Sequence, residues 1–149
     1  MDEFKKLLTE YVSLKSISTD PQYKAEMVKT AEWIKLYLQK YGFTVEFISG
    51  PTCNPIVFGN LVVNPEYKTV LIYGHYDVQP SDQFYLTEKD GRLVGRGVVD
   101  NKGQNFIHMY TVCELLKQNK LIYNVKFLIE GNEETGNDDM SDLLRLHKD

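Results

Sequence analysis

Apolar residues recur at helical spacing in two N-terminal segments, residues 2–16 and 24–41, and Gly42 ends the second. Residues 105–119 and 138–149 predict two more helices, the last with an acidic first turn. The positions expected to face inward are Phe4, Leu7, Leu8 and Tyr11, then Met27, Ala31, Ile34, Leu38 and Tyr41, then Phe106, Met109, Cys113 and Leu116. Trp33, Tyr37 and Tyr41 follow the same spacing and are expected to pack in the core.

Strand-like segments lie between these helices. Residues 43–49 alternate apolar and polar, as a half-buried strand does, and residues 56–63 predict the next strand. Residues 69–73 are apolar throughout, which is typical of a central strand covered on both faces, and residues 124–129 are largely apolar as well. Residues 84–97 predict a hairpin that turns at Asp90-Gly91.

The alternation of helices with buried strands predicts one domain of the α/β class. We expect a three-layer α/β/α arrangement with a largely buried mixed sheet and helices on both of its faces. A chain of 149 residues is long enough for one such core. Functional side chains in these sheets gather at the carboxyl ends of strands, which directs attention to the segments that follow the predicted strands.

Charge and composition exclude several classes of function. With 17 basic and 21 acidic residues the net charge is −4, and no basic patch predicts nucleic-acid binding. No apolar stretch approaches the ~20 residues of a membrane span, and the first residues lack the apolar centre of a signal peptide. Cys53 and Cys113 have no CxxC spacing, so we expect free thiols and a cytoplasmic location.

Three glycine-containing motifs combine a predicted strand end or helix start with residues able to bind a metal. They are "GHYD" at 74–77, "GRGVVDNKG" at 95–103 and "EGNEETG" at 130–136. The second lacks the GK[ST] ending of a phosphate-binding loop and has an acidic residue where phosphate would lie. A nucleotide-binding domain is therefore a weak alternative.

Histidine and carboxylates together suit zinc, with manganese and cobalt as alternatives. His75 and Asp77 are two residues apart, so on an extended segment they share a face, and Asp77 can hold a metal-binding His75 in place. Asp100 is a candidate to bridge two metals. Glu133 and Glu134 are adjacent and expected to point in opposite directions, so that one can bind metal while the other faces substrate.

These motifs resemble those of the M20 family of metallopeptidases, which includes di-zinc dipeptidases, aminoacylases and relatives of carboxypeptidase G2. The "DNKG" and "EGNEETG" forms most resemble the carnosinase-like dipeptidase branch. The resemblance extends over the whole chain and implies a zinc-peptidase-like fold. It also implies hydrolysis of an amide bond in dipeptides or N-acyl amino acids by two divalent metal ions, most simply zinc.

The resemblance further implies a role for each residue. His75 would bind one metal, Asp77 would orient His75, and Asp100 would bridge both metals. Glu133 would be the general base, and Glu134 would bind the other metal. Asp100 would also be joined to Asn101 by a cis peptide bond.

The family pattern continues beyond what this chain contains. The family supplies a further carboxylate ligand, a late histidine ligand and a lid domain that mediates dimerisation, and neither His108 nor His147 matches the missing ligand. Residues 1–149 are therefore expected to be the N-terminal portion of a catalytic domain, either a piece of a longer protein or a short gene product. Each metal would lack one ligand, so the isolated chain is expected to bind metal weakly and to be inactive.

Two further expectations concern partners. An incomplete sheet would leave an unpaired apolar edge, so we expect a homo-oligomer formed through strands. A small peptide or N-acyl amino acid is the expected substrate of the complete enzyme. The alternative is a non-catalytic metal-binding or interaction fragment with an inherited, incomplete site. Lys102 and Arg96 are expected to position the turn around Asp100 rather than to bind substrate.

Overall fold

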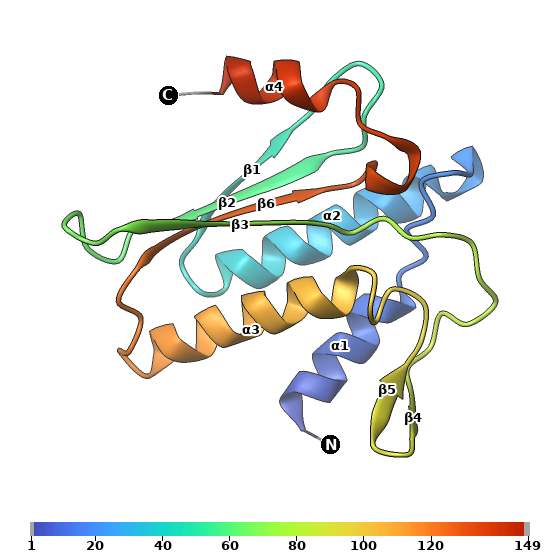
Figure 1. Cartoon of the computed structure of the whole chain (residues 1–149), viewed down its shortest axis with the longest axis horizontal. Helices are drawn as coiled ribbons and strands as arrows, with labels where there is room; N and C mark the ends of the chain where they lie inside the picture. The colour runs from blue at the N-terminus through green and yellow to red at the C-terminus, as the bar shows by residue number, and fades with distance from the viewer. Residues whose placement is uncertain (1, 148–149) are drawn as a thin grey trace.

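The computed structural model describes residues 2–147, which form four α-helices, six strands and two 3₁₀ turns (Figure 1). The helices are α1 (Glu3–Ser13), α2 (Lys24–Gln39), α3 (Lys102–Lys117) and α4 (Met140–Leu146). The strands are β1 (Thr44–Ile48), β2 (Ile56–Leu61), β3 (Thr69–His75), β4 (Thr87–Lys89), β5 (Arg92–Val94) and β6 (Asn124–Glu130). The 3₁₀ turns are η1 (Pro21–Tyr23) and η2 (Glu133–Thr135).

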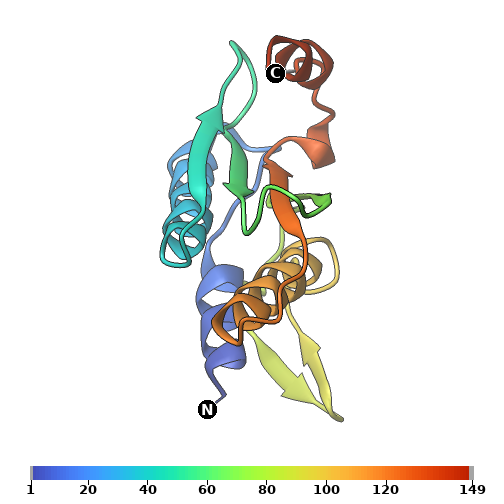
Figure 2. The same cartoon turned by 90° about the vertical axis from the view of Figure 1, so that its left-hand side faces the viewer.

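The main sheet is mixed and has the strand order β1-β2-β6-β3. β1 pairs with β2 and β2 with β6 in antiparallel fashion, whereas β3 runs parallel to β6. Helices α1, α2 and α3 lie on one side of this sheet, and α4 lies on the other side, near β1 and β2 (Figures 1 and 2). The predicted α/β class and mixed sheet are confirmed, although α4 is the only helix of the second layer among residues 2–147.

One expectation about the sheet is wrong: β3 is an edge strand, not a central one. Among residues 2–147 only β6 pairs with it. Leu71 and Tyr73 point to the outer face of the sheet and are 58% and 53% exposed, whereas Ile72 between them packs against the core. A continuous apolar run shows that a strand is suited to burial, but not which segment would cover it.

The core between the helices and the sheet is rich in aromatic rings. Phe106 of α3 is fully buried, and its ring centroid lies 5.2 Å from that of Phe4 in α1 and 5.5 Å from that of Tyr37 in α2. Trp33 stacks on Tyr37 at 5.6 Å. The aromatic residues at helical spacing are packing residues, as predicted.

The hairpin of β4 and β5 turns at Asp90 and Gly91, as the sequence predicts. Both residues have positive φ, 53° and 71°, which a two-residue turn of this type requires and which glycine adopts without strain. The hairpin projects from the end of the molecule near α1 (Figure 1). The Lys5 side chain of α1 forms a 2.7 Å ion pair with Glu88 of β4.

Both cysteines are free thiols, Cys113 buried and Cys53 half-buried. Within residues 2–147, no helix is both long enough and apolar enough to cross a bilayer.

Candidate metal centre

The parallel pairing of β3 with β6 brings the motifs at 74–77 and 130–136 together at the carboxyl ends of these two strands. His75 is the last residue of β3, and in the register it lies beside Glu130, the last residue of β6. Glu133 and Glu134 follow in η2. Asp100 lies directly before α3, whose N-terminus approaches the same strand ends. This arrangement agrees with the expectation that functional residues gather at the carboxyl ends of strands.

The imidazole of His75 lies at the centre of the arrangement. Its Nε2 is 3.0 Å from Oδ1 of Asp100 and 3.8 Å from Oε2 of Glu133. Its Nδ1 is 3.0 Å from the carbonyl oxygen of Asp77. His75 itself is buried, whereas the carboxylates of Asp100 and Glu133 are exposed, so Nε2 faces the open side of the site.

The Nδ1 contact determines which ring nitrogen can bind a metal. A carbonyl oxygen only accepts hydrogen bonds, so Nδ1 must carry a hydrogen and donate it. In neutral His75 the lone pair is then on Nε2, facing the Asp100 carboxylate. Two acceptors 3.0 Å apart repel each other unless a proton or a metal cation lies between them.

Carboxylates around His75 favour its protonated form when no metal is present. Burial of the imidazole acts to lower the pKa of His75, but the hydrogen bonds and charge of Asp77, together with the charge of Glu133, outweigh it. They raise the pKa from its ordinary value of 6.5 to about 9. A divalent cation would replace this proton at Nε2.

Asp77 holds the turn that bears the two glutamates as well as His75. Its carboxylate is fully buried and accepts hydrogen bonds from the backbone N–H groups of Glu133 at 3.2 Å and Glu134 at 3.1 Å. It also accepts a 2.6 Å hydrogen bond from the hydroxyl of Ser18. Asp77 therefore links the histidine to the turn that bears both glutamates. Sequence reasoning missed Ser18, because nothing in its local pattern indicates a contact with the strand end.

The turn around Asp100 is tightly packed. The Asp100-Asn101 peptide bond is cis, as the family resemblance implies. The Asn105 amide donates to the His75 carbonyl oxygen at 2.7 Å. A Cβ atom on Gly74 would overlap the side-chain oxygens of Asn105 and Asn101. The absence of a side chain at Gly74 therefore lets the end of β3 lie close to Asn101 and Asn105.

The two adjacent glutamates have different contacts, although η2 is a 3₁₀ turn rather than the extended segment assumed from the sequence. Glu133 faces His75, whereas Oε2 of Glu134 accepts a 2.8 Å hydrogen bond from Gln79. In the described part of the chain, no three His, Cys, Asp or Glu side chains are grouped as a metal site requires. His75 contacts Asp77, Asp100 and Glu133 in separate pairs, whereas the Glu134 side chain is hydrogen-bonded to Gln79 instead.

The remaining candidates lie outside this centre. Lys102 is fully buried and donates hydrogen bonds to the carbonyl oxygens of Leu14, at 2.5 Å, and Tyr11, at 3.1 Å, so it joins the start of α3 to the end of α1. Burial lowers the pKa of Lys102 to about 7. His108 is exposed on α3, and Nδ1 of His147 lies 2.8 Å from the carbonyl oxygen of Leu143.

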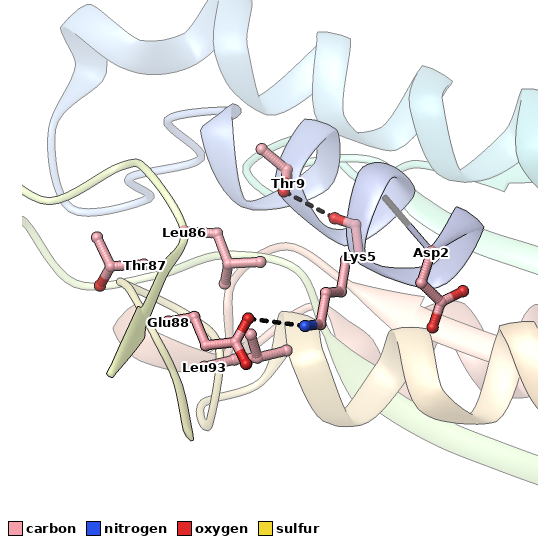
Figure 3. Close-up of a pocket in the computed structure, with 7 residues that line it drawn as sticks. All are labelled: Asp2, Lys5, Thr9, Leu86, Thr87, Glu88 and Leu93. Atoms are coloured by element: carbon pink, nitrogen blue, oxygen red, sulfur yellow. Dashed lines mark hydrogen bonds and ion pairs between the residues drawn. The ribbon is translucent and has the colours of Figure 1, made fainter. Parts of the chain in front are cut away.

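A separate pocket of about 430 Å³ lies between α1 and the hairpin (Figure 3). It is lined by Asp2, Lys5, Thr9, Leu86, Thr87, Glu88 and Leu93, with the Lys5–Glu88 ion pair across it. None of the motif residues lines it, so this pocket is not part of the candidate centre.

The chemistry and spacing of the donor atoms fit a divalent cation. An imidazole nitrogen and a carboxylate oxygen bound to one tetrahedral zinc at ~2.0–2.2 Å are roughly 3.3 Å apart. The observed separation of His75 Nε2 and Asp100 Oδ1, 3.0 Å, is close to this value. His75 and Asp100 can therefore hold one metal with a small adjustment.

Comparison with known proteins identifies the family of the chain. The model of peptidase family M20/M25/M40 matches residues 71–148. The chain is 34% identical to human Beta-Ala-His dipeptidase, over 99% of this chain and 33% of the relative. It is also 34% identical to the Cys-Gly metallodipeptidase dug1 of Schizosaccharomyces pombe, over 97% of this chain and 34% of the relative.

Solved structures give the same result for the fold. Human carnosine dipeptidase 1 superposes with a TM-score of 0.91 at 32% identity, over 99% of this chain and 36% of that structure. The M20 family metallo-carboxypeptidase Sso-CP2 of Sulfolobus solfataricus superposes with a TM-score of 0.88 at 32% identity, over 99% of this chain and 35% of that structure. This chain spans about a third of the length of the curated relatives it matches. The family model, the relatives and the fold agree, and the chain belongs to peptidase family M20/M25/M40.

Proposed function

We propose that the protein that contains this chain hydrolyses the amide bond of dipeptides or N-acyl amino acids with two divalent metal ions, most simply zinc. Residues 1–149 would be the N-terminal part of its catalytic domain. The observation that supports this most strongly is His75, whose Nδ1 is fixed by Asp77 while Nε2 faces Asp100 at 3.0 Å. Dipeptides are favoured because several relatives are named as dipeptidases.

Each residue of the centre has a role in this proposal. His75 and Asp100 would hold one metal, and Asp100 and Glu134 would hold the other. Asp77 is a positioning residue, because it contacts His75 and the backbone of η2 rather than the open face of the site. When bound, the metals would polarise the substrate carbonyl and lower the pKa of an attacking water.

Glu133 is suited to be the general base. Its carboxylate is 48% exposed and lies 3.8 Å from His75 Nε2, beside the position where a metal would bind. It can accept a proton from the attacking water and then donate that proton to the leaving amine. Its backbone N–H donates to Asp77, which fixes the place of the residue beside His75.

The second candidate is a non-catalytic metal-binding or interaction fragment. The observation that favours it is that residues 2–147 do not form a three-ligand metal group. We expect the isolated chain to be inactive for this reason, and the family resemblance implies further ligands and a lid that residues 1–149 would not supply. A cytoplasmic location and a homo-oligomer remain part of the proposal.

Activity of the complete protein on a panel of dipeptides and N-acyl amino acids, with zinc and after its removal by a chelator, tests the proposed function. Zinc-dependent release of amino acids is the expected result. If the complete protein hydrolyses none of these substrates at any metal loading, the fragment or binding-module alternative holds.

Substitution of the two glutamates in the complete protein distinguishes their roles. Glu133→Gln should lower turnover by roughly 10²–10⁴-fold, as loss of a general base does, while both metals remain bound. Glu134→Ala should instead lower the metal content. Elemental analysis beside kinetics provides the comparison, and equal metal loss in both variants would show that the assignment of the pair is wrong.

A further inference from the structure

A buried carboxylate outside the assigned roles lies directly behind the candidate centre. Glu130, at the end of β6, is only 3% exposed. Its Oε1 accepts a hydrogen bond from the hydroxyl of Tyr73 in β3, and its Oε2 accepts one from the side-chain amide of Asn137 at 2.8 Å. The two oxygens of one carboxylate thus join the edge strand, the adjacent strand and the segment after η2.

The Glu130–Asn137 contact closes the loop that bears both glutamates. This loop leaves β6 at Glu130, passes through η2 and reaches Asn137 after Gly136, whose φ of 76° turns the chain. The hydrogen bond therefore connects the first and last residues of the loop. Asp77 fixes its middle by accepting the N–H groups of Glu133 and Glu134.

Asn54 fixes the start of the loop through two hydrogen bonds. The Asn54 backbone N–H donates to the side-chain oxygen of Asn132 at 2.6 Å, and the Asn54 amide donates to the carbonyl oxygen of Gly131 at 2.9 Å. The start and middle of the loop are therefore held by several bonds. At its end, the Asn137 amide makes one short hydrogen bond, to Glu130, besides a long 3.8 Å contact with the Met140 sulfur.

We propose that Tyr73, Glu130 and Asn137 form a clamp that positions Glu133 and Glu134, so that these three are positioning residues of the metal centre. The inference rests on the proposed function for the roles of the two glutamates. The clamp itself is defined by contacts alone. Opening it would free the C-terminal end of the loop and weaken the hydrogen bonds from η2 to Asp77.

The side chain of Asn137 makes a selective test possible. The side-chain oxygen of Asn137 is buried and has no hydrogen-bond partner among the described residues. Asn137→Ala therefore removes the short hydrogen bond to Glu130 and breaks no hydrogen bond to that oxygen. Tyr73→Phe removes the other contact of Glu130 and keeps the ring. Asp138→Ala is the matched control, since Asp138 is the exposed neighbour of Asn137.

Amide hydrogen exchange of the 149-residue chain, followed by NMR, is the primary measurement. Asn137→Ala should speed exchange at the Glu133 and Glu134 amides by about tenfold or more, the factor expected for loss of a charge-assisted hydrogen bond. Exchange at Phe127 in the middle of β6 should not change, which shows that the sheet is intact. Tyr73→Phe should act in the same direction, and Asp138→Ala should leave all these amides as in the wild type.

Titration with Co²⁺, followed by its visible absorption, connects the clamp to the metal centre. Asn137→Ala should weaken Co²⁺ binding several-fold and alter the spectrum, whereas Asp138→Ala should do neither. If the wild-type chain gives no Co²⁺ spectrum, the proposed metal centre fails, and the exchange data alone still decide the clamp. Unchanged exchange at Glu133 and Glu134 in both Asn137→Ala and Tyr73→Phe would overturn it.

Discussion

Asp77 links two properties of the candidate centre that are usually considered separately. Its buried carboxylate raises the pKa of His75, and it also holds the backbone of Glu133 and Glu134. The same side chain therefore sets the charge of the proposed metal ligand and the place of the proposed base. Ser18 donates to this carboxylate and so takes part in both effects.

The raised pKa of His75 predicts a pH-dependent stability of the metal-free chain. The folded-state pKa of about 9 exceeds the ordinary value of 6.5, so protonation of His75 favours the folded state. This contribution is complete below about pH 6.5 and is lost as the pH rises to about 9. Urea unfolding of wild type and His75→Asn, with chelator, should show that the wild type loses stability relative to the variant over this range.

The difference in unfolding free energy between wild type and His75→Asn separates the effect of His75 from that of other groups that titrate at high pH. Repeating the measurement with His108→Asn provides a control, because His108 is exposed on α3. A wild-type advantage over His75→Asn that is constant from pH 6 to 9 would contradict the raised pKa.

At the scale of the elements, one side chain joins the three helices on the inner face of the sheet. Phe106 of α3 contacts Phe4 of α1 and Tyr37 of α2, and it is fully buried. The Asp100 turn precedes α3 directly, so the docking of this helix also determines where Asp100 lies. Packing in the core and geometry at the centre are thereby coupled.

Truncation of this ring should destabilise the whole chain. We expect Phe106→Ala to lower the free energy of unfolding by about 3–5 kcal/mol, since it removes a large buried side chain and leaves a cavity. Ile107→Ala is the matched control on the same helix, because Ile107 is 52% exposed, and it should change stability by no more than about 0.5 kcal/mol. Chemical denaturation measures both, and equal losses would show that Phe106 does not have this role.

The helices and strands could be predicted from the sequence because each depends on local periodicity. Residues 24–41 and the Asp90-Gly91 turn are examples in which spacing and turn chemistry determine the structure. The motif residues His75 and Asp100 could also be predicted, since glycine-flanked ligand types follow strands or precede a helix. The contact of Ser18 with Asp77 could not, because 59 residues separate the two in sequence.

The contact between Tyr73 and Glu130 could not be predicted either, for a different reason. Both residues lie at the ends of segments expected to be apolar strands, and neither segment indicates a partner for the polar group it contains. Only the parallel register of β3 and β6 brings the hydroxyl of Tyr73 to the carboxylate of Glu130. Register between distant strands is not encoded in either strand alone.

At the scale of the whole molecule, the outer face of the sheet is only partly covered. A groove of about 520 Å³ lies between α4 and this face, lined in part by Leu71, Leu128 and Leu144. It adjoins the edge of β3 that no other strand of residues 2–147 pairs with, and β3 contains neither lysine nor proline to discourage pairing. An exposed apolar edge of this kind is a template for another strand.

We therefore expect concentration-dependent self-association of the 149-residue chain through β3. Leu71→Lys should shift the population to monomer, because a charge on an edge strand opposes pairing. Leu36→Lys on α2 is the control, as Leu36 is 63% exposed but lies on a helix. Sedimentation velocity over a range of concentrations provides the measurement, and equal association of both variants would contradict pairing through β3.

Zinc binding by the 149-residue chain tests most directly whether His75 and Asp100 form a metal centre. Calorimetry should show weak zinc binding by the wild type that is lost in His75→Asn and kept in His108→Asn, with negligible dipeptide hydrolysis. Zinc binding that is unaffected by His75→Asn would contradict the site. Tight binding of two zinc ions with robust turnover would contradict the account of the chain as one part of a larger catalytic domain.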